Sequence, residues 1–255
     1  MVTSSISGTD PVVRELMDPS TRRSNQLQVF ILYFHDSPKL VETVKIFASF
    51  LRKLCEVDVV LDTEEECDIL ISPETWISKQ LTYFCSKIET KNCDVKEKKI
   101  ILVESSGAVR CQKALHERRI IQPKDVLDLF CYGLSIIMAN MESIKDYCHL
   151  MVIRFPNALE NDTLLGIVPD KRYSIPEHLV SLYLDLHDNK ICHHSSQYQK
   201  ILKKWGSCSA YKDLLNAVEN LKSSVEPTHL VMIRDAQRNR EMEYDVNKEE
   251  YSTHF

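Results

Sequence analysis

Short apolar runs alternate with helical patterns along the middle of the chain. The run VFILYF at 29–34 is apolar throughout, which is typical of a strand buried on both faces of a sheet. Similar runs predict strands at 57–61, 99–103 and 150–155, and a short extra strand at 230–233. Apolar residues spaced to form one face of a helix predict helices over about 38–54, 73–88, 124–141, 176–186 and 209–223.

Strands and helices in this order predict an α/β fold, a parallel sheet flanked by helices with right-handed crossovers. The two ends of the chain differ from the middle in composition. Residues 1–26 are rich in Ser, Thr, Pro and Arg, and residues 236–255 are almost all polar, so we expect a flexible arm and a flexible tail. The folded domain is therefore predicted to span residues 27–235.

Composition and charge narrow the range of functions. The formal net charge of -5 leaves no overall excess of cations for nucleic-acid phosphates or an anionic membrane surface. The most apolar segment, 126–141, is shorter than the roughly 20 residues that a membrane span requires. The N-terminus lacks the pattern of a secretory signal. We therefore expect a cytoplasmic protein that binds no nucleic acid and does not insert into a membrane.

The nine cysteines form no C-x-x-C pair, and most lie in apolar stretches, where a free thiol behaves as a small hydrophobic side chain. Reduced core thiols are expected here rather than a disulfide framework. They stand at positions 55, 67, 85, 93, 111, 131, 148, 192 and 208.

Motifs that bind cofactors are missing from the loops where a parallel sheet usually binds ligands. The first strand is followed by His35-Asp36-Ser37-Pro38, and neither a dinucleotide fingerprint nor a phosphate-binding P-loop occurs. The third strand ends in Glu104-Ser105-Ser106, where a phospho-receiver domain would carry an aspartate. His187 with Cys192-His193-His194 lacks zinc-site spacing. Asp185, His187 and Ser195 lack the nucleophile elbow of a hydrolase. No cofactor and no metal are expected.

Four blocks of sequence resemble SEFIR domains, the cytoplasmic domains of interleukin-17 receptors and of their adaptor. The likeness covers about residues 28–223. It implies a flavodoxin-like sheet of about five strands, related to the Toll/interleukin-1 receptor (TIR) domain. The blocks are VFILYFHDSPKLVETVKIFASFLRKLCEVDVVLD, the Glu64–Gln80 segment with its Trp76-x-x-x-Gln80, DVLDLFCYGLSIIMANM and VPDKRYSIPEHLVSLYLDL.

The resemblance implies signalling by contact between SEFIR domains, in an interleukin-17-type pathway that leads indirectly to ubiquitin ligases of the TRAF type. A receptor tail and a free adaptor both fit the sequence, and the adaptor is favoured because the chain starts at Met1 without a signal. Trp76 and Gln80 match the family's second-helix signature. We expect both residues to serve in helix packing rather than as anchors of an interface.

An enzyme of the TIR type is the alternative function. Some TIR relatives cleave NAD with a glutamate that follows the third strand, often in a Trp-Cys-x-x-Glu context. The corresponding residues here are Arg110-Cys111-Gln112-Lys113-Ala114, so alanine replaces the glutamate. The nearest carboxylates, Glu104 and Glu117, do not keep the spacing. The resemblance therefore favours a protein without enzymatic activity.

Two charged stretches are candidate interaction sites. An acidic run, DTEEECD at 62–68, follows the second strand, where TIR relatives carry a protruding interaction loop. An acidic loop on one copy could pair head to tail with a basic segment on the next. The alternative for each stretch is a solvent-exposed surface that contacts no partner. The candidates are Glu64, Glu65 and Glu66 in the acidic run and Arg110, Lys113, His116, Arg118 and Arg119 after the third strand.

Overall fold

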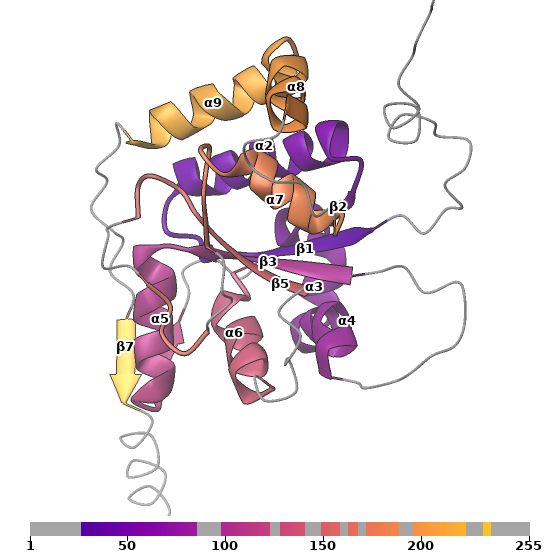
Figure 1. The fold of residues 1–255 in the computed structure, drawn as a ribbon. Helices are drawn as coiled ribbons and strands as arrows, with labels where there is room; N and C mark the ends of the chain where they lie inside the picture. Colours follow the sequence, from indigo (N-terminus) through magenta and orange to yellow (C-terminus); the bar gives the residue numbers. More distant parts are fainter. Residues whose placement is uncertain are drawn as a thin grey trace, which may run out of the picture.

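A five-stranded parallel sheet forms the centre of the protein (Figure 1). The computed structural model describes residues 27–85, 98–122, 128–140, 149–158, 163–167, 172–188, 196–222 and 232–235. The predicted arm (1–26) and tail (236–255) lie outside these ranges. The strands of the sheet are β1 (Gln28–Leu32), β2 (Asp58–Val60), β3 (Lys98–Glu104), β5 (Leu150–Arg154) and β6 (Arg172–Ser174).

The strands lie in the order β2-β1-β3-β5-β6, and each neighbouring pair is parallel. This order reverses direction between β1 and β3, as in flavodoxin-like folds. Side chains of β1 alternate between two cores: Val29 and Ile31 enter one, and Phe30 and Leu32 enter the other. The predicted fold class is confirmed, and the unbroken apolar runs follow from burial on both faces.

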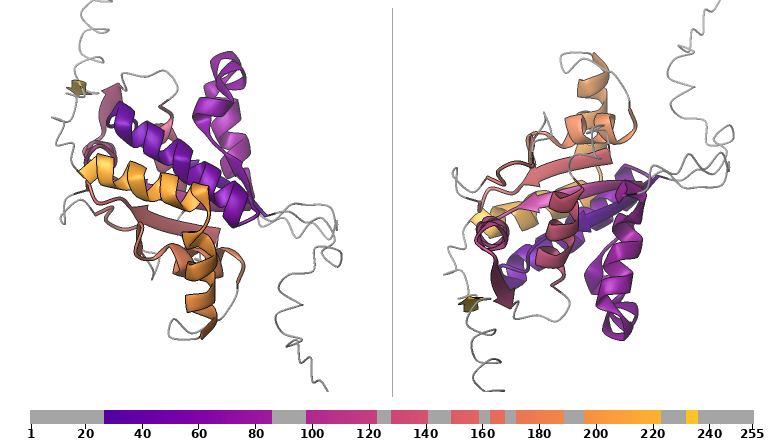
Figure 2. Two further views of the ribbon diagram at one scale, coloured as in Figure 1. Left: turned by 90° about the horizontal axis from the view of Figure 1, so that it is seen from above. Right: turned by 90° about the horizontal axis from the view of Figure 1, so that it is seen from below.

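Four helices cover one face of the sheet, above it in Figure 1. Ser37 caps the first of them by accepting a hydrogen bond from the Leu40 N–H at 3.2 Å. Figure 2 shows α2 and α9 side by side, and Phe50 of α2 meets Trp205 edge to face, with ring centroids 5.1 Å apart. The helices are α2 (Pro38–Leu54), α7 (Leu179–Leu186), α8 (Ser196–Gly206) and α9 (Ser209–Lys222).

The remaining helices cover the opposite face. In Figure 2, α6 lies between α4 and α5. A Cβ added at Gly133 would lie 3.0 Å from the Leu32 side chain, so α6 packs closely on β1. The helices on this face are α3 (Glu66–Ile71), α4 (Pro73–Cys85), α5 (Ser106–His116) and α6 (Phe130–Ala139). The short 3-10 helix η1 (Asp62–Glu64) connects β2 to α3.

Several elements differ from the sequence-based expectations. The fifth strand, β6, and helix α8 were not predicted, since β6 has three residues and α8 contains many polar side chains. The helix expected over 124–141 is described only as α6, because residues 123–127 and 141–148 lie outside the described ranges. The expected strand at 230–233 corresponds to β7 (Met232–Asp235), which pairs with β4 (Arg119–Gln122) in a separate two-stranded antiparallel sheet.

Lys99 is a fully buried cation at the start of β3. Its ammonium donates to the backbone oxygens of Asp185 (3.2 Å) and Leu186 (2.8 Å) and to the Asp188 carboxylate (2.9 Å). The last carbonyls of a helix have no partner within the helix, and a cation there also interacts favourably with the helix dipole. Lys99 therefore fastens the C-terminal end of α7 to the sheet.

Replacing Lys99 with methionine keeps the aliphatic stem but leaves these oxygens without their donor. We expect the free energy of unfolding to fall by about 2–4 kcal/mol, measured by chemical denaturation. The control is Lys53→Met on the exposed side of α2, which should change it by less than about 0.5 kcal/mol. Equal effects of the two substitutions would contradict this role for Lys99.

Candidate protein-interaction surfaces

The first turn of α5 is held directly against the carboxyl end of β1. Ser105 caps the helix by accepting from the Ala108 N–H at 3.2 Å, and the Gly107 N–H donates to the Asp36 carboxylate at 3.1 Å. A Cβ at Gly107 would overlap that carboxylate and the Phe34 ring. This close approach requires glycine, and it lies between β1 and β3, where flavodoxin-like sheets usually bind ligands.

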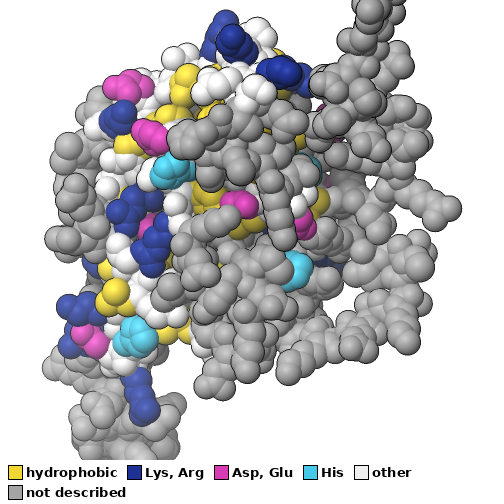
Figure 3. Space-filling view, in the orientation of Figure 1, with side chains coloured by type: hydrophobic (Ala, Val, Ile, Leu, Met, Phe, Trp, Pro, Cys, Tyr) yellow, Lys and Arg dark blue, Asp and Glu magenta, His cyan; other side chains and the backbone are white. Residues whose placement is uncertain are grey.

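The basic candidates divide into two groups along α5 and the residues after it. The Arg110 guanidinium lies 3.6 Å from the buried Asp36 carboxylate and belongs to the contact between α5 and β1. Arg119 pairs with Glu117 at 3.1 Å. We call the exposed side chains of this set the α5 edge, and Figure 3 shows basic side chains and a histidine grouped over α5 at the lower left. The α5 edge consists of Lys113, His116, Arg118 and Arg119.

A second segment lies beside the α5 edge. The Gln112 carboxamide donates to the Leu165 backbone oxygen at 2.6 Å and accepts from the Leu165 N–H at 2.7 Å. These two bonds fix the backbone of Leu165, while its side chain remains 72% exposed. Neither residue could be identified as a contact from the sequence, because the pairing joins positions 53 residues apart.

Glu104, at the end of β3, is buried within an ion-pair network. Arg154 and Arg172 each place a guanidinium nitrogen 3.0 Å from its carboxylate oxygens, and the Leu164 N–H donates to it at 3.0 Å. Its side chain is 0% exposed. Ala114, which stands where NAD-cleaving TIR relatives carry glutamate, is also buried. Glu104 therefore ties the 163–167 segment to the sheet.

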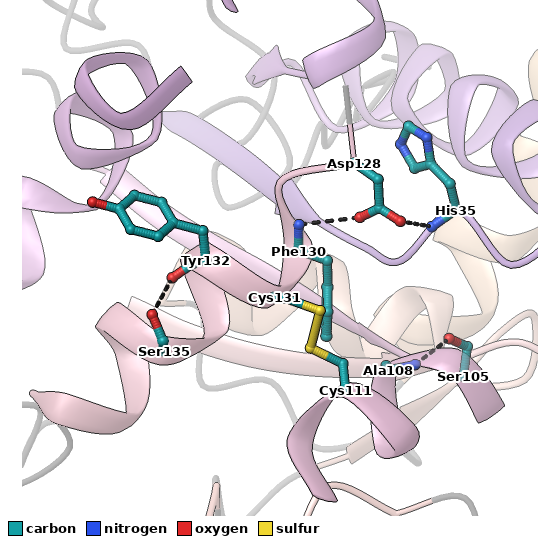
Figure 4. The surroundings of a disulfide bond; sticks show 9 residues. All are labelled: His35, Ser105, Ala108, Cys111, Asp128, Phe130, Cys131, Tyr132 and Ser135. Carbon is teal, nitrogen blue, oxygen red and sulfur yellow. Dashed lines mark hydrogen bonds between the residues drawn. A yellow bond between two sulfur atoms is a disulfide. The ribbon is translucent and has the colours of Figure 1, made fainter. Parts of the chain in front are cut away.

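Cys111 of α5 and Cys131 of α6 form a disulfide, with Cα atoms 5.8 Å apart (Figure 4). The expectation of reduced thiols is wrong for this pair. The two helices pack side by side and bring the residues within the Cα separation that a disulfide requires, which their spacing in the sequence does not reveal. Cys55, Cys67 and Cys208 are free thiols.

The acidic run is not the loop that the sequence suggested, because it folds into η1 and α3. Glu64 accepts a hydrogen bond from Arg52 at 2.8 Å, and Glu65 accepts one from the Trp76 indole N–H. Glu66 is exposed. Two of the three candidate glutamates therefore make contacts within the protein.

Trp76 and Gln80 lie on the inner side of α4, and both are about 95% buried. The Trp76 ring meets Phe30 of β1 edge to face, with centroids 5.6 Å apart. Its indole also holds α3 through Glu65. This placement puts Trp76 in the contact between α3, α4 and the sheet.

Two large apolar side chains at the end of α3 are exposed, Leu70 by 58% and Ile71 by 83%. The sequence analysis did not identify these two residues as candidates. The available signal was the run Ile69-Leu70-Ile71 directly after the acidic residues, since a six-residue helix can turn only part of such a run inward. Ile69 is the residue that it buries. We call this region the α3 edge, which consists of Leu70, Ile71 and the exposed carboxylates Glu66, Asp68 and Glu74.

A buried polar network lies at the carboxyl ends of β1 and β2. Asp62 accepts from the Tyr33 hydroxyl at 3.0 Å and lies 3.0 Å from His35 Nε2. Burial, together with Asp62, raises the pKa of Tyr33, so its hydroxyl stays protonated. Asp128 accepts from the backbone N–H groups of His35 (3.0 Å) and Phe130 (3.1 Å), as Figure 4 shows. It therefore joins the start of α6 to β1.

Burial raises the pKa of Asp128 from its ordinary value of 3.8 to about 6, against the opposing influence of His35 and the two N–H donors.

His187 with Cys192-His193-His194 was the set of possible metal ligands in the sequence. Among the described residues, no three His, Cys, Asp or Glu side chains are placed to hold a metal ion. His187 lies 2.9 Å from the Cys55 carbonyl oxygen, and residues 192–195 lie outside the described ranges.

The raised pKa predicts how stability depends on pH. The contribution of Asp128 is fully present below about pH 4 and is lost as the pH rises through about 6. Relative to Asp128→Asn, the wild-type free energy of unfolding should gain about 2 kcal/mol between pH 7 and pH 4.5. Denaturant titrations at both pH values measure this. The gain should persist in a His35→Gln background, and its disappearance there would assign it to the histidine.

The family model of the SEFIR domain matches residues 27–186. The crystal structure of the IL-17 receptor B SEFIR domain resembles the chain with 15% sequence identity and a TM-score of 0.43, covering 64% of this chain and 96% of that one. No curated protein matches. In the described part of the chain, no helix has both the length and the apolarity to cross a bilayer.

The matched region extends from β1 to the end of α7 and contains the α3 edge, the α5 edge and the 163–167 segment. It spans more than half of the chain. Within it, β1, α2, β2, α4, β3, α6, β5 and α7 follow the predicted order. The sequence did not predict η1, α3, α5, β4 and β6. This protein belongs to the SEFIR domain family, whose members are signalling domains.

Proposed function

We propose that this protein is a cytoplasmic signalling module that binds other SEFIR domains in an interleukin-17-type receptor or adaptor pathway. The α5 edge is the observation that carries the proposal. The α5 edge presents one lysine, two arginines and one histidine, and the neighbouring exposed carboxylate is Glu117, which pairs with Arg119. Such a concentration of one charge favours a partner surface of the opposite charge.

The setting of α5 supports its use as a recognition surface. Its first turn is fixed on β1 by Gly107, and the helix packs against α6. A rigid surface loses little conformational entropy when a partner binds. Binding would bring receptor and adaptor together and lead indirectly to TRAF-type ubiquitin ligases. A receptor tail and a free adaptor would use the same surface.

The alternative function, NAD hydrolysis, lacks a suitably placed carboxylate among the residues considered for it. Glu104 is enclosed by Arg154 and Arg172, and an ionised carboxylate so paired is held in place by the fold. Glu117 lies at the exposed end of α5, paired with Arg119. These positions support a binding module over a hydrolase.

Reversing charge on the α5 edge tests the proposal. We expect Lys113→Glu with Arg118→Glu to weaken binding to the SEFIR domain of an interleukin-17-type receptor by roughly tenfold or more, because attraction becomes repulsion. Titration calorimetry at low and moderate salt measures the change. The wild-type affinity should itself fall as salt rises.

The matched control is Lys203→Glu with Lys204→Glu, which makes the same charge change at exposed positions of α8, on the opposite side of the sheet. This variant should bind within about twofold of wild type, since surface charges far from an interface matter little. Equal losses in both variants would indicate nonspecific charge effects. Full binding by the α5 variant would remove the α5 edge from the interface.

Incubation with NAD separates the two functions. We expect no nicotinamide release above buffer, measured by chromatography over hours with purified protein. Release that disappears in Glu104→Gln or Glu117→Gln would instead identify a hydrolase and assign its carboxylate. Urea denaturation of both variants would show whether such a loss reflects the site or the fold.

A further inference from the structure

We propose that the α3 edge is an apolar-centred docking surface for the α5 edge of a second copy of this chain, so that copies associate head to tail. The inference rests on the proposed function and names the complementary surface. Leu70 and Ile71 form its centre. Exposed apolar groups surrounded by polar side chains are typical of protein–protein contact sites.

The exposure of Leu70 and Ile71 is fixed by the fold around them. Ile69 is fully buried and anchors the last turn of α3. The Ser72 N–H donates to the Asp68 carbonyl at 3.2 Å, and the Trp76 N–H donates to the Ser72 carbonyl at 2.9 Å. The turn between α3 and α4 is therefore held at both ends, and it keeps the two side chains at the surface.

The negative charge around Leu70 and Ile71 favours a partner surface with positive charge. Residues 62–78 contain six carboxylates and no lysine or arginine. Glu66, Asp68 and Glu74 are exposed around the apolar pair. A shallow groove between α4 and α6 begins at Glu74 and extends the surface; it is lined by Glu74, Thr75, Ser78, Lys79 and Tyr132. A complementary surface would be basic with an exposed apolar group.

The α5 edge and the neighbouring Leu165 together have both properties. Its cations face solvent, and Leu165, 72% exposed, is bonded to Gln112 of the same helix. Among the described residues, the large apolar side chains with the highest exposure are Ile71, Leu165 and Leu70. Leu70 and Ile71 belong to the α3 edge, and Leu165 is bonded to α5 beside the α5 edge. An apolar group in or beside each charged region allows charge to set the orientation while apolar burial supplies affinity.

The two surfaces lie at opposite ends of one helix layer. In Figure 2 the layer runs from α4 through α6 to α5, and α3 packs beside α4. The surfaces therefore lie too far apart to meet within one molecule. A contact between different surfaces of identical copies leaves one surface of each kind unused, so the assembly can grow.

Sedimentation velocity over a range of concentrations tests the inference. Wild type should associate increasingly with concentration. Ile71→Asp should weaken this association roughly tenfold or more, although it adds negative charge to an acidic surface. A contact held by charge alone would instead become stronger. Because Ile71 is 83% exposed, the substitution should leave the midpoint of thermal unfolding nearly unchanged.

Mixing two blocked variants gives a result specific to head-to-tail association. Ile71→Asp retains its α5 edge, and Lys113→Glu with Arg118→Glu retains its α3 edge. Each variant should sediment as a monomer alone, while an equimolar mixture should form a dimer that grows no further. The Lys203→Glu, Lys204→Glu variant should associate like wild type.

Three outcomes would overturn the inference: a wild type that stays monomeric at every concentration, normal association of Ile71→Asp, or a mixture that forms no dimer. None of them contradicts the proposed function if the wild type still binds the receptor SEFIR domain through its α5 edge. Loss of that heterologous binding would remove the proposed function itself.

Discussion

A parallel sheet must have both faces covered, and this requirement shapes the whole protein. Successive side chains of each strand point to opposite faces, so Val29 and Phe30 enter different cores. The inner faces of both helix layers are consequently occupied by packing. The outer faces of the helices and the two ends of each layer remain exposed, and the proposed α3 and α5 edges lie at such ends.

The requirement to cover the sheet also uses many of the charges that stand out in the sequence. Arg110 of α5 forms an ion pair with Asp36, and Glu65 accepts a hydrogen bond from the Trp76 indole. Glu104 binds two arginines from later parts of the chain. Charges that are clustered in the sequence thus have different roles once the chain is folded. A surface must be identified by what remains exposed.

The sequence predicted the elements whose signal is local. The strand β1 is an unbroken apolar run, and α2 and α9 each have one apolar face with recognisable ends. It did not predict β6, whose three residues form a strand only because β5 offers an edge. The Cys111–Cys131 pair and the bond between Gln112 and Leu165 depend on helix packing and on distant segments. For the same reason, the sequence could name the acidic residues but not the apolar pair at their end.

The packing of α9 on α2 has a consequence for where the domain can be cut. The match to the SEFIR family model ends at residue 186, before α8 and α9. Yet Trp205 and Leu214 belong to the same apolar core as Phe47 and Phe50. A fragment that stopped at the limit of family likeness would expose an aromatic surface to water and become prone to aggregation. The segment that must be present for stable folding therefore includes α8 and α9 and is longer than the segment that matches the family model.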